Sequence, residues 1–313
     1  MTRTLPVTTG TGGTERRDQG SILDAIGDTP LMLLEGIWVK LEYLNPSGSI
    51  KARIAKYMLE RAEHEGALHA GDTIVEASSG NTGNAMSMVA AAKGYRMLVV
   101  MPANVSTERA AISRAFGAEV LTVGDFHVNE ALDKAVELGR RPGFFAPQQF
   151  DSDWNVEENR TWLGPEVLNQ LPPGVVPDAV VSGVGTGGTI VGVGQAFRQV
   201  NPACHIAAME PDESCTLRCG DIAKHHIEGI ADGFVPGVFA RHRDIVDELI
   251  AVHSADALAE MRRLVTDYGL FVGPSSGAHL LAAKRLRERH PELADVVTFF
   301  CDEGEKYLTE HYV

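Results

Sequence analysis

Short apolar runs alternate with longer helical patterns along most of this 313-residue chain. The apolar runs have the length and composition of strands, and they lie at 73–76, 97–101, 119–123, 144–146, 179–182, 205–209, 247–252 and 296–300. Helical patterns lie between them, for example at 107–116, 128–139, 190–199, 254–268 and 278–289. Strands that alternate with helices in this way form parallel sheets covered by helices on both faces. The sequence therefore predicts the α/β class.

One lysine, Lys51, follows a cluster of turn-forming residues at 45–49 and opens a helical pattern. Ser49 is the expected N-cap of that helix. A lysine in the first turn is unusual, because the helix dipole favours anions at that end. A solvated surface lysine is the simplest interpretation, and a chemical role for its amine is the alternative.

Two glycine-rich turns elsewhere in the chain have the composition of anion-binding sites. Residues 76–83 follow a strand-like run and precede a helix at 84–93, and residues 183–189 follow the run at 179–182. Glycines and small hydroxyl side chains at such turns present N–H groups and further donors to a carboxylate or phosphate. Tight packing alone also explains a glycine-rich turn, so neither turn identifies a ligand by itself.

Taken together, these segments resemble the cysteine synthase (O-acetylserine sulfhydrylase) and cystathionine β-synthase family of pyridoxal-phosphate enzymes. The matching segments are IGDTPL (26–31), NPSGSIKARIA (45–55), SSGNTG (78–83), MPANVSTER (101–109), QQF (148–150), GTGGT (185–189), EGIADGF (228–234) and GPSSGA (273–278). They follow the family's order and cover nearly everything from about residue 21 to the end. Any one of them could arise by chance, whereas eight in order are specific.

The resemblance implies the tryptophan-synthase β-like fold, fold type II of these cofactor enzymes, with two three-layer α/β domains and mostly parallel sheets. A smaller mobile domain is expected at 46–148. A larger domain that binds the cofactor phosphate is expected from 21–45 plus 149–313, with the cofactor at the carboxyl ends of strands. Residues 1–20 are expected to form a disordered tail. The family also implies a homodimer.

The resemblance further assigns roles to individual residues. Lys51 is expected to bind pyridoxal phosphate as a Schiff base and to act as general base. The cofactor phosphate is expected at the turn made by Gly185, Thr186, Gly187, Gly188 and Thr189. The ring hydroxyl of the cofactor is expected to face Asn81. The amino-acid substrate is expected to contact Ser78, Ser79, Asn81, Thr82, Gln149 and Gly229.

Ser275 matches the family serine that faces the pyridine nitrogen of the cofactor. A neutral hydroxyl at that place leaves the nitrogen unprotonated and weakens the ring as an electron sink. Loss of a leaving group from Cβ is then favoured over racemisation or transamination. A helix N-cap is the alternative role for Ser275 and Ser276.

The resemblance therefore implies β-replacement on an O-activated L-serine through an α-aminoacrylate intermediate, with a small nucleophile as second substrate. Cysteine synthase is the leading interpretation, and synthesis of 2,3-diaminopropionate or cystathionine stays open. The resemblance implies that the segments with four acidic residues, Asp151, Asp153, Glu228 and Asp232, border the active-site cleft. If two or more of them face it, its mouth is negative and an amine is favoured over hydrosulfide.

Two other classes of function are compatible with parts of the sequence. Gly183-x-Gly185-x-x-Gly188 after a strand fits a dinucleotide-binding turn, with Glu210 near the position expected to bind a ribose. A nicotinamide-dependent oxidoreductase, however, leaves Lys51 and Ser275 unexplained. A catalytically inactive relative that serves as a binding module is the third interpretation, and the retained lysine argues against it.

Composition excludes further classes. The net charge of −14 argues against nonspecific nucleic-acid binding, which needs a basic surface. No apolar run reaches the ~18 residues that span a bilayer. The four cysteines show no paired CxxC spacing, so no metal site is predicted. A reducing cytosol is the expected location.

Overall fold

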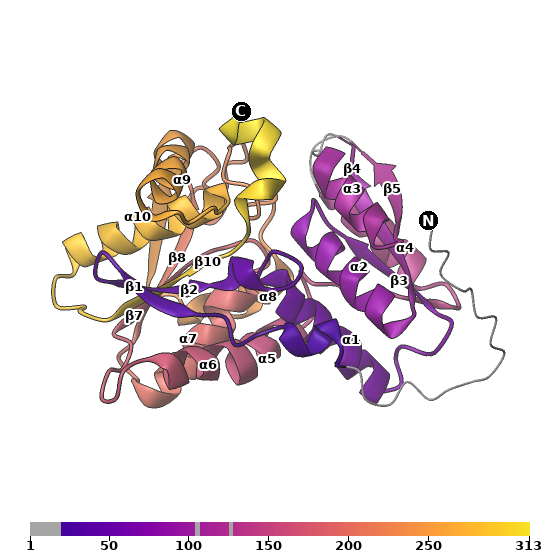
Figure 1. Ribbon diagram of the computed structural model, residues 1–313, viewed down its shortest axis with the longest axis horizontal. Helices are drawn as coiled ribbons and strands as arrows, with labels where there is room; N and C mark the ends of the chain where they lie inside the picture. Colours follow the sequence, from indigo (N-terminus) through magenta and orange to yellow (C-terminus); the bar gives the residue numbers. More distant parts are fainter. Residues whose placement is uncertain (1–19, 104–106, 125–127) are drawn as a thin grey trace, which may run out of the picture.

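The computed structural model describes residues 20–103, 107–124 and 128–313, so the predicted tail lies outside the described residues apart from Gly20. Two separate sheets organise the chain. One has six strands in the order β1-β2-β10-β7-β8-β9, and the other has four in the order β5-β4-β3-β6. Figure 1 shows them in two lobes, each with helices packed on its sheet. The α/β fold with mostly parallel sheets is confirmed.

The four-stranded sheet is entirely parallel. Its strands are β3 (Thr73–Ala77), β4 (Arg96–Pro102), β5 (Glu119–Val123) and β6 (Phe144–Phe145). Its helices are α1 (Lys51–His64), α2 (Asn81–Lys93), α3 (Thr107–Ala115) and α4 (Asn129–Gly139). Successive residues of β3 point to opposite faces, so Ile74 packs with α1 and α2 while Val75 packs with α4. Both faces are therefore covered, as the continuous apolar runs require.

The six-stranded sheet is parallel except for its N-terminal hairpin. Its strands are β1 (Leu31–Leu34), β2 (Ile37–Leu41), β7 (Ala179–Gly183), β8 (His205–Pro211), β9 (Glu248–Val252) and β10 (Val296–Phe300). Its helices are α5 (Trp154–Glu158), α6 (Gly164–Gln170), α7 (Gly188–Val200), α8 (Gly237–Arg241), α9 (Ser254–Tyr268) and α10 (Pro274–Arg289). Val180 packs on the α7 side and Val181 on the side of α9 and α10.

Short 3-10 and π segments complete the described elements. The 3-10 helices are η1 (Ile22–Ala25), η2 (Glu42–Leu44), η4 (Arg243–Ile245) and η5 (Gly304–Tyr307), and the π segments are η3 (Asn159–Leu163) and η6 (Leu308–Tyr312). In the described part of the chain, no helix has the length and apolar character needed to cross a membrane. The domain boundaries expected at 46 and 148 stay predictions.

The eight predicted strands correspond to β3–β10, each within two residues. The hairpin β1–β2 and the helical segment at 154–170 were not predicted. Helix α10 begins at Pro274 rather than at residue 278, because proline is pre-organised for the first helical position.

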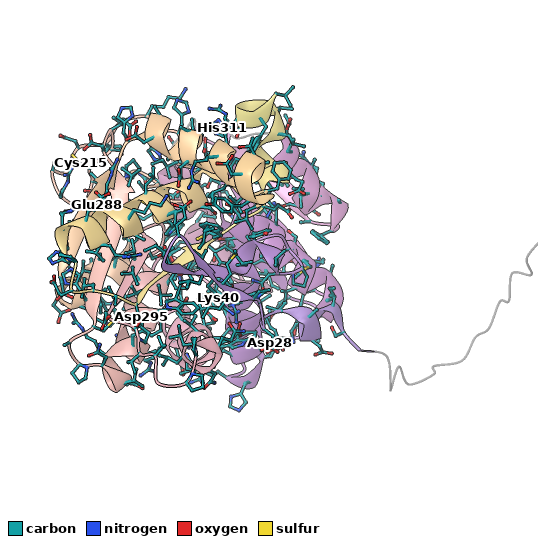
Figure 2. All side chains as sticks on the ribbon, turned by 60° about the vertical axis from the view of Figure 1, so that its left-hand side comes forward. Asp28, Lys40, Cys215, Glu288, Asp295 and His311 are labelled. Carbon is teal, nitrogen blue, oxygen red and sulfur yellow. The ribbon has the colours of Figure 1, made fainter. Side chains whose placement is uncertain are left out.

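A buried network of charged side chains joins α1 to the large sheet. Arg53 Nε lies 2.7 Å from a Glu42 carboxylate oxygen, and Arg53 Nη2 lies 2.7 Å from Glu166. Lys40 lies in β2 (Figure 2) and its Nζ is 2.5 Å from the same Glu166 carboxylate. Burial acts to raise the pKa of Glu166, but the hydrogen bonds from Arg53 and Lys40 outweigh it and lower the pKa to about 2. The network holds the helix that begins at Lys51.

Glu158 lies beside this network and gives the first prediction. Both of its carboxylate oxygens are buried without a hydrogen-bond partner, and burial raises its pKa from the usual 4.5 to about 8. The folded protein therefore binds a proton here that the unfolded chain releases above pH 4.5, so stability falls as the pH rises from about 4.5 to about 8. Glu158→Gln is expected to remove this loss.

Urea unfolding at pH 5 and pH 8 checks this expectation. The gain in unfolding free energy of Glu158→Gln over wild type should be a few kcal/mol larger at the higher pH. Glu157→Gln, which changes the partly exposed neighbouring residue, is the matched control. If the free energy of unfolding changed with pH in the same way in wild type and in Glu158→Gln, the Glu158 carboxyl would not hold this proton.

Candidate active site

Two adjoining cavities lie where the carboxyl ends of strands from both sheets meet. Lys51, Asn81 and Gly185 line both. One of the two cavities is also lined by Ser275, and the other by Gln149. Lining side chains thus come from the N-terminal, middle and C-terminal thirds of the chain. Other predicted site residues that line one or both cavities are Ser78, Ser79, Thr82, Thr186, Gly187, Thr189 and Gly229.

Lys51 is the first residue of α1, as predicted, but the N-cap is Ile50 and not Ser49. The backbone of Ser49 forms a β-bridge with Asp302, and the Ile50 N–H donates to the Cys301 carbonyl at 2.8 Å. The Ser49 hydroxyl is buried without a hydrogen-bond partner. The helix therefore starts where the C-terminal segment holds the chain rather than where a side chain caps it.

Asn81 is held by residues that follow β10. Its Nδ2 donates to Asp302 at 2.6 Å, and its Oδ1 accepts from Lys306 Nζ at 3.0 Å. Tyr307 donates to the same Asp302 oxygen, whereas Asp302 Oδ1 is buried without a partner. Lys306 also donates to the carbonyls of Ser47 and Gly48, at 2.8 and 3.0 Å. These three C-terminal residues were not predicted, and their only sequence signal is that they follow a strand.

The turn at 78–83 is built by its own side chains. Ser78 Oγ accepts the N–H groups of Gly80 and Gly83 at 3.0 and 2.9 Å. Thr82 donates to Gln149 Oε1 at 2.6 Å, and Gln149 Nε2 donates to the Ala77 carbonyl at 3.0 Å. These bonds fix Gln149 against the start of α2. The helix N-terminus and the neighbouring hydroxyls can together bind a carboxylate.

The turn at 185–189 has the shape of a phosphate cradle. A Cβ at Gly185 would lie 2.6 Å from the Gly229 carbonyl oxygen, and one at Gly188 would lie 2.0 Å from Asn155 Oδ1. Gly187 has a φ of 87°, which favours glycine. The turn leads into the 13-residue helix α7, whose first N–H groups have no intrahelical partner. The Gly188 N–H donates to Thr186 Oγ1 at 3.3 Å, and the close backbone approach and the helix N-terminus fit a phosphate group.

Ser275 is the second residue of α10, is buried, and lines one of the two cavities. The N-cap of α10 is Gly273, which caps without a side chain, so neither Ser275 nor Ser276 has the capping role. Ser276 Oγ instead accepts the Cys301 N–H at 3.1 Å. Ser275 therefore lies at the cavity wall, and its role toward a ligand stays a prediction.

His279 is a cavity residue that the sequence did not indicate. Its Nε2 accepts the Gly183 N–H at 2.7 Å, and its Nδ1 lies 2.6 Å from the Ser275 carbonyl. Burial lowers its pKa to about 4, so the ring is neutral with the proton on Nδ1. His279 thus fixes the end of β7 to the first turn of α10.

A wider, open vestibule lies outside the two cavities. Glu228 and Asp232 line it, but so do Arg109 and Lys224. Asp151 and Asp153 do not reach it and instead bind Arg241 at the surface, at 2.5 and 2.8 Å. Two of the four acids thus face the cleft, with Arg109 and Lys224 beside them, and the expected negative mouth stays a prediction.

The dinucleotide interpretation also fails on geometry. Glu210 is buried, and its carboxylate accepts the N–H groups of Leu217 and Arg218 at 2.7 and 3.2 Å. The Glu210 carboxylate therefore binds N–H groups of the loop that follows it and is not available to bind a ribose.

Comparisons with known proteins agree with this geometry. Residues 22–302 match the family model described as pyridoxal-phosphate dependent enzyme. A cysteine synthase of Staphylococcus aureus (strain N315) is 41% identical over 92% of this chain and 95% of its own length. A probable cysteine synthase of Bacillus subtilis (strain 168) is 38% identical over 91% and 95%.

Solved structures give the same result. O-ureido-L-serine synthase superimposes with a TM-score of 0.86 at 37% identity and covers 94% of both chains. An O-acetylserine-dependent cystathionine β-synthase from Helicobacter pylori superimposes with a TM-score of 0.88 at 31% identity, over 95% of this chain and all of that one.

Proposed function

Because this chain belongs to the family of pyridoxal-phosphate-dependent enzymes and is a β-replacement enzyme, we propose that it makes L-cysteine from an O-activated L-serine and sulfide. The observation that carries the proposal is one cavity lined by Lys51, by the glycine turn before α7 and by Ser275. An amine, a phosphate cradle and a neutral hydroxyl are the groups that this chemistry needs at three points of the cofactor.

We assign the cofactor contacts by these positions. Lys51 holds pyridoxal phosphate covalently, the residues at 185–189 hold its phosphate, and Asn81 faces its ring. When bound, the cofactor withdraws electrons from Cα and so permits loss of the β-substituent. Lys51 Nζ, once released, takes the proton from Cα and returns one at the end of the reaction. His279 stays neutral throughout and keeps Ser275 in place.

The amino-acid carboxylate is assigned to the N-terminus of α2. Ser79, Thr82 and Gln149 line the cavity that adjoins the cofactor position. Because Gln149 is already oriented by Thr82 and by the Ala77 carbonyl, little ordering is needed when a carboxylate binds.

The vestibule favours a second candidate for the nucleophile. Its size exceeds what sulfide needs, and its mixed charges, including Arg109 and Glu228, suit a nucleophile that carries its own ammonium and carboxylate groups. An amino-acid thiol or amine would then replace sulfide, as in cystathionine or 2,3-diaminopropionate synthesis.

A turnover matrix tests both candidates. The holoenzyme is assayed with O-acetyl- and O-phospho-L-serine against sulfide, homocysteine, urea-type and amine nucleophiles, and products are identified by mass spectrometry. The largest kcat/KM with sulfide supports the first candidate, and the largest with homocysteine or an amino acid supports the second. No β-replacement with any pair would contradict both.

Ser275 carries a further prediction. Ser275→Asp is expected to slow β-replacement more than Ser275→Ala, because an acid would protonate the pyridine nitrogen, whereas alanine leaves it neutral. Steady-state kinetics and the absorbance of the bound cofactor measure the two effects. An active aspartate variant beside an inactive alanine variant would show that the role is wrongly assigned.

We also propose that the enzyme is a cytoplasmic homodimer with a smaller mobile domain at 46–148. The proposal rests on the family resemblance, and light scattering of the holoenzyme tests the subunit number. Small-angle scattering with and without substrate tests whether the smaller domain moves.

A further inference from the structure

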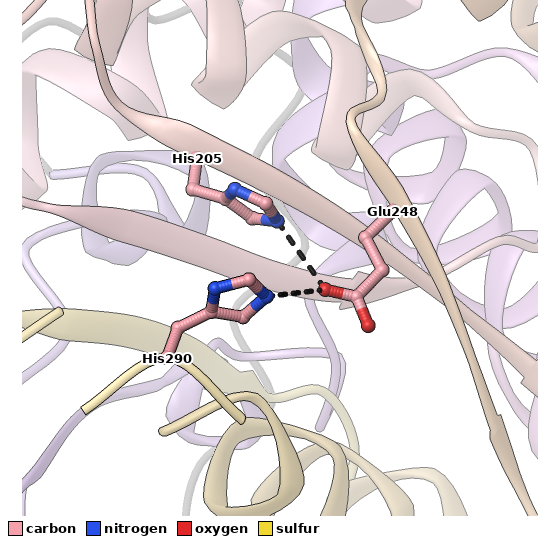
Figure 3. A group of neighbouring side chains, drawn as sticks. All are labelled: His205, Glu248 and His290. Carbon is pink, nitrogen blue, oxygen red and sulfur yellow. Dashed lines mark hydrogen bonds and ion pairs between the residues drawn. The ribbon is translucent and has the colours of Figure 1, made fainter. Parts of the chain in front are cut away.

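Three side chains with metal-binding atoms meet at the amino ends of two strands of the large sheet (Figure 3). His205 is the first residue of β8, Glu248 is the first residue of β9, and His290 follows α10 as its C-cap. The Nε2 atoms of His205 and His290 lie 3.4 and 3.2 Å from the same carboxylate oxygen, Glu248 Oε2. One ligand atom from each residue lies within 4.8 Å of the other two.

The fold explains why these residues meet. Glu248 pairs with Ala207 of β8, and His205 lies two residues before Ala207, on the same face of the sheet. Helix α10 packs on that face, so the residue at its end reaches the same point. The active-site turns follow the carboxyl ends of the strands. The length of β8, about 20 Å, therefore separates the cluster from the active site.

We propose that His205, Glu248 and His290 form a binding site for a divalent transition metal ion of the zinc class. Two imidazoles and one carboxylate are a donor set that Zn²⁺ takes in tetrahedral sites. With metal–ligand distances of about 2.0–2.1 Å, neighbouring ligand atoms of a tetrahedral site are about 3.3–3.4 Å apart. The two measured separations have this length. Water supplies the fourth ligand.

The surroundings of the cluster orient its ligands. His205 Nε2 is a buried atom that has no hydrogen-bond partner within the described residues. Arg289 binds the other oxygen of Glu248, which leaves Oε2 for a metal. Glu292 lies 3.4 Å from His290 Nδ1, so a carboxylate orients the ring with its Nε2 toward the site. The C-terminus of α10 also carries partial negative charge, which favours a cation.

The bound ion would join the end of α10 to β8 and β9, so its effect is on stability. Ligands that bind only the folded state raise the melting temperature by mass action. We therefore expect Zn²⁺ to raise the melting temperature of the holoenzyme by several degrees. Basal β-replacement should not depend on it, because the site lies at the opposite end of the strands.

A competition titration tests the site. Chelator-treated holoenzyme is titrated with Zn²⁺ against a chromophoric chelator, and with Co²⁺ as a spectroscopic probe. We expect one site with the visible absorption of tetrahedral Co²⁺ and without the near-ultraviolet bands of thiolate ligands. His290→Gln and Glu248→Gln should each weaken binding at least about 100-fold, and Glu292→Gln about 10-fold through loss of orientation.

His69→Gln is the matched control, because His69 is exposed and faces a single carboxylate, that of Asp72. It should leave affinity and the melting shift unchanged. A second group, Cys215, Cys219 and Asp221, could compete for zinc. The Cys219→Ser variant should therefore still bind the first equivalent of Zn²⁺. Loss of binding in Cys219→Ser with retention in His290→Gln would overturn the proposal, as would equally weak binding in wild type and His290→Gln.

Discussion

Lys51→Ala is expected to lower β-replacement by several orders of magnitude, because one amine both holds the cofactor and moves the Cα proton. Lys51 lines both inner cavities, and no other described lysine lines either of them. Lys306 is close in space, but its Nζ is committed to the Ser47 and Gly48 carbonyls and to Asn81. Burial lowers the pKa of Lys306 without freeing it from these partners.

Borohydride reduction tests directly whether Lys51 carries the cofactor. The wild-type holoenzyme should lose its visible absorbance and carry the reduced cofactor on the peptide that contains Lys51. Lys56→Ala is the matched control on the same helix, since Lys56 donates to the Leu23 carbonyl, and it should turn over within about twofold of wild type. Reduced cofactor on a peptide with another lysine would contradict the assignment of Lys51.

Arg53→Met is expected to lower the free energy of unfolding by about 3–5 kcal/mol, because removing one partner of a buried ion pair leaves the other charge uncompensated. Arg53 has no exposed surface, and it bonds both carboxylate oxygens of Glu42 and of Glu166. Lys40 would remain as a partner for Glu166, but Glu42 would lose its guanidinium. The loss should therefore be partly recovered in Arg53→Met with Glu42→Gln.

Urea unfolding followed by fluorescence measures the change, with the cofactor content matched between variants. Arg61→Met is the control on the same helix, because its pair with Glu65 is solvent-exposed and should contribute little to stability. Equal stability of Arg53→Met and Arg61→Met would contradict a structural role for the buried network.

The sequence predicted those strands that their own residues mark as apolar, and it missed features that depend on residues far along the chain. The apolar runs of β3, β7, β8 and β10 are buried on both faces, so composition alone marks them. Strand β2 was missed because Lys40 interrupts its apolar pattern, and Lys40 is buried only because Glu166, far along the chain, neutralises it. The Ser49 cap was wrong for the same reason, since the backbone there pairs with Asp302.

The candidate site likewise has residues that a local motif indicates and residues that no local motif indicates. Lys51 and the two glycine turns carry their own motifs, and the structure brings them to adjoining cavities. His279, Asp302 and Lys306 act through backbone groups and amides supplied by distant segments, which no local pattern records. His205, Glu248 and His290 have no motif spacing, because they meet only through strand register and the end of a helix.

The strand order has a consequence for synthesis of the chain on the ribosome. Chains emerge N-terminus first, and contiguous units fold as they appear. The four-stranded sheet uses residues 73–145 alone and can form early. Strand β2, in contrast, bonds to β10, so the hairpin before Lys51 must wait for nearly the whole chain. Joining them closes a loop of more than 250 residues, which makes this step slow. The cofactor pocket is therefore completed only after β10 and Asp302 have been synthesised, and pyridoxal phosphate binds after that step.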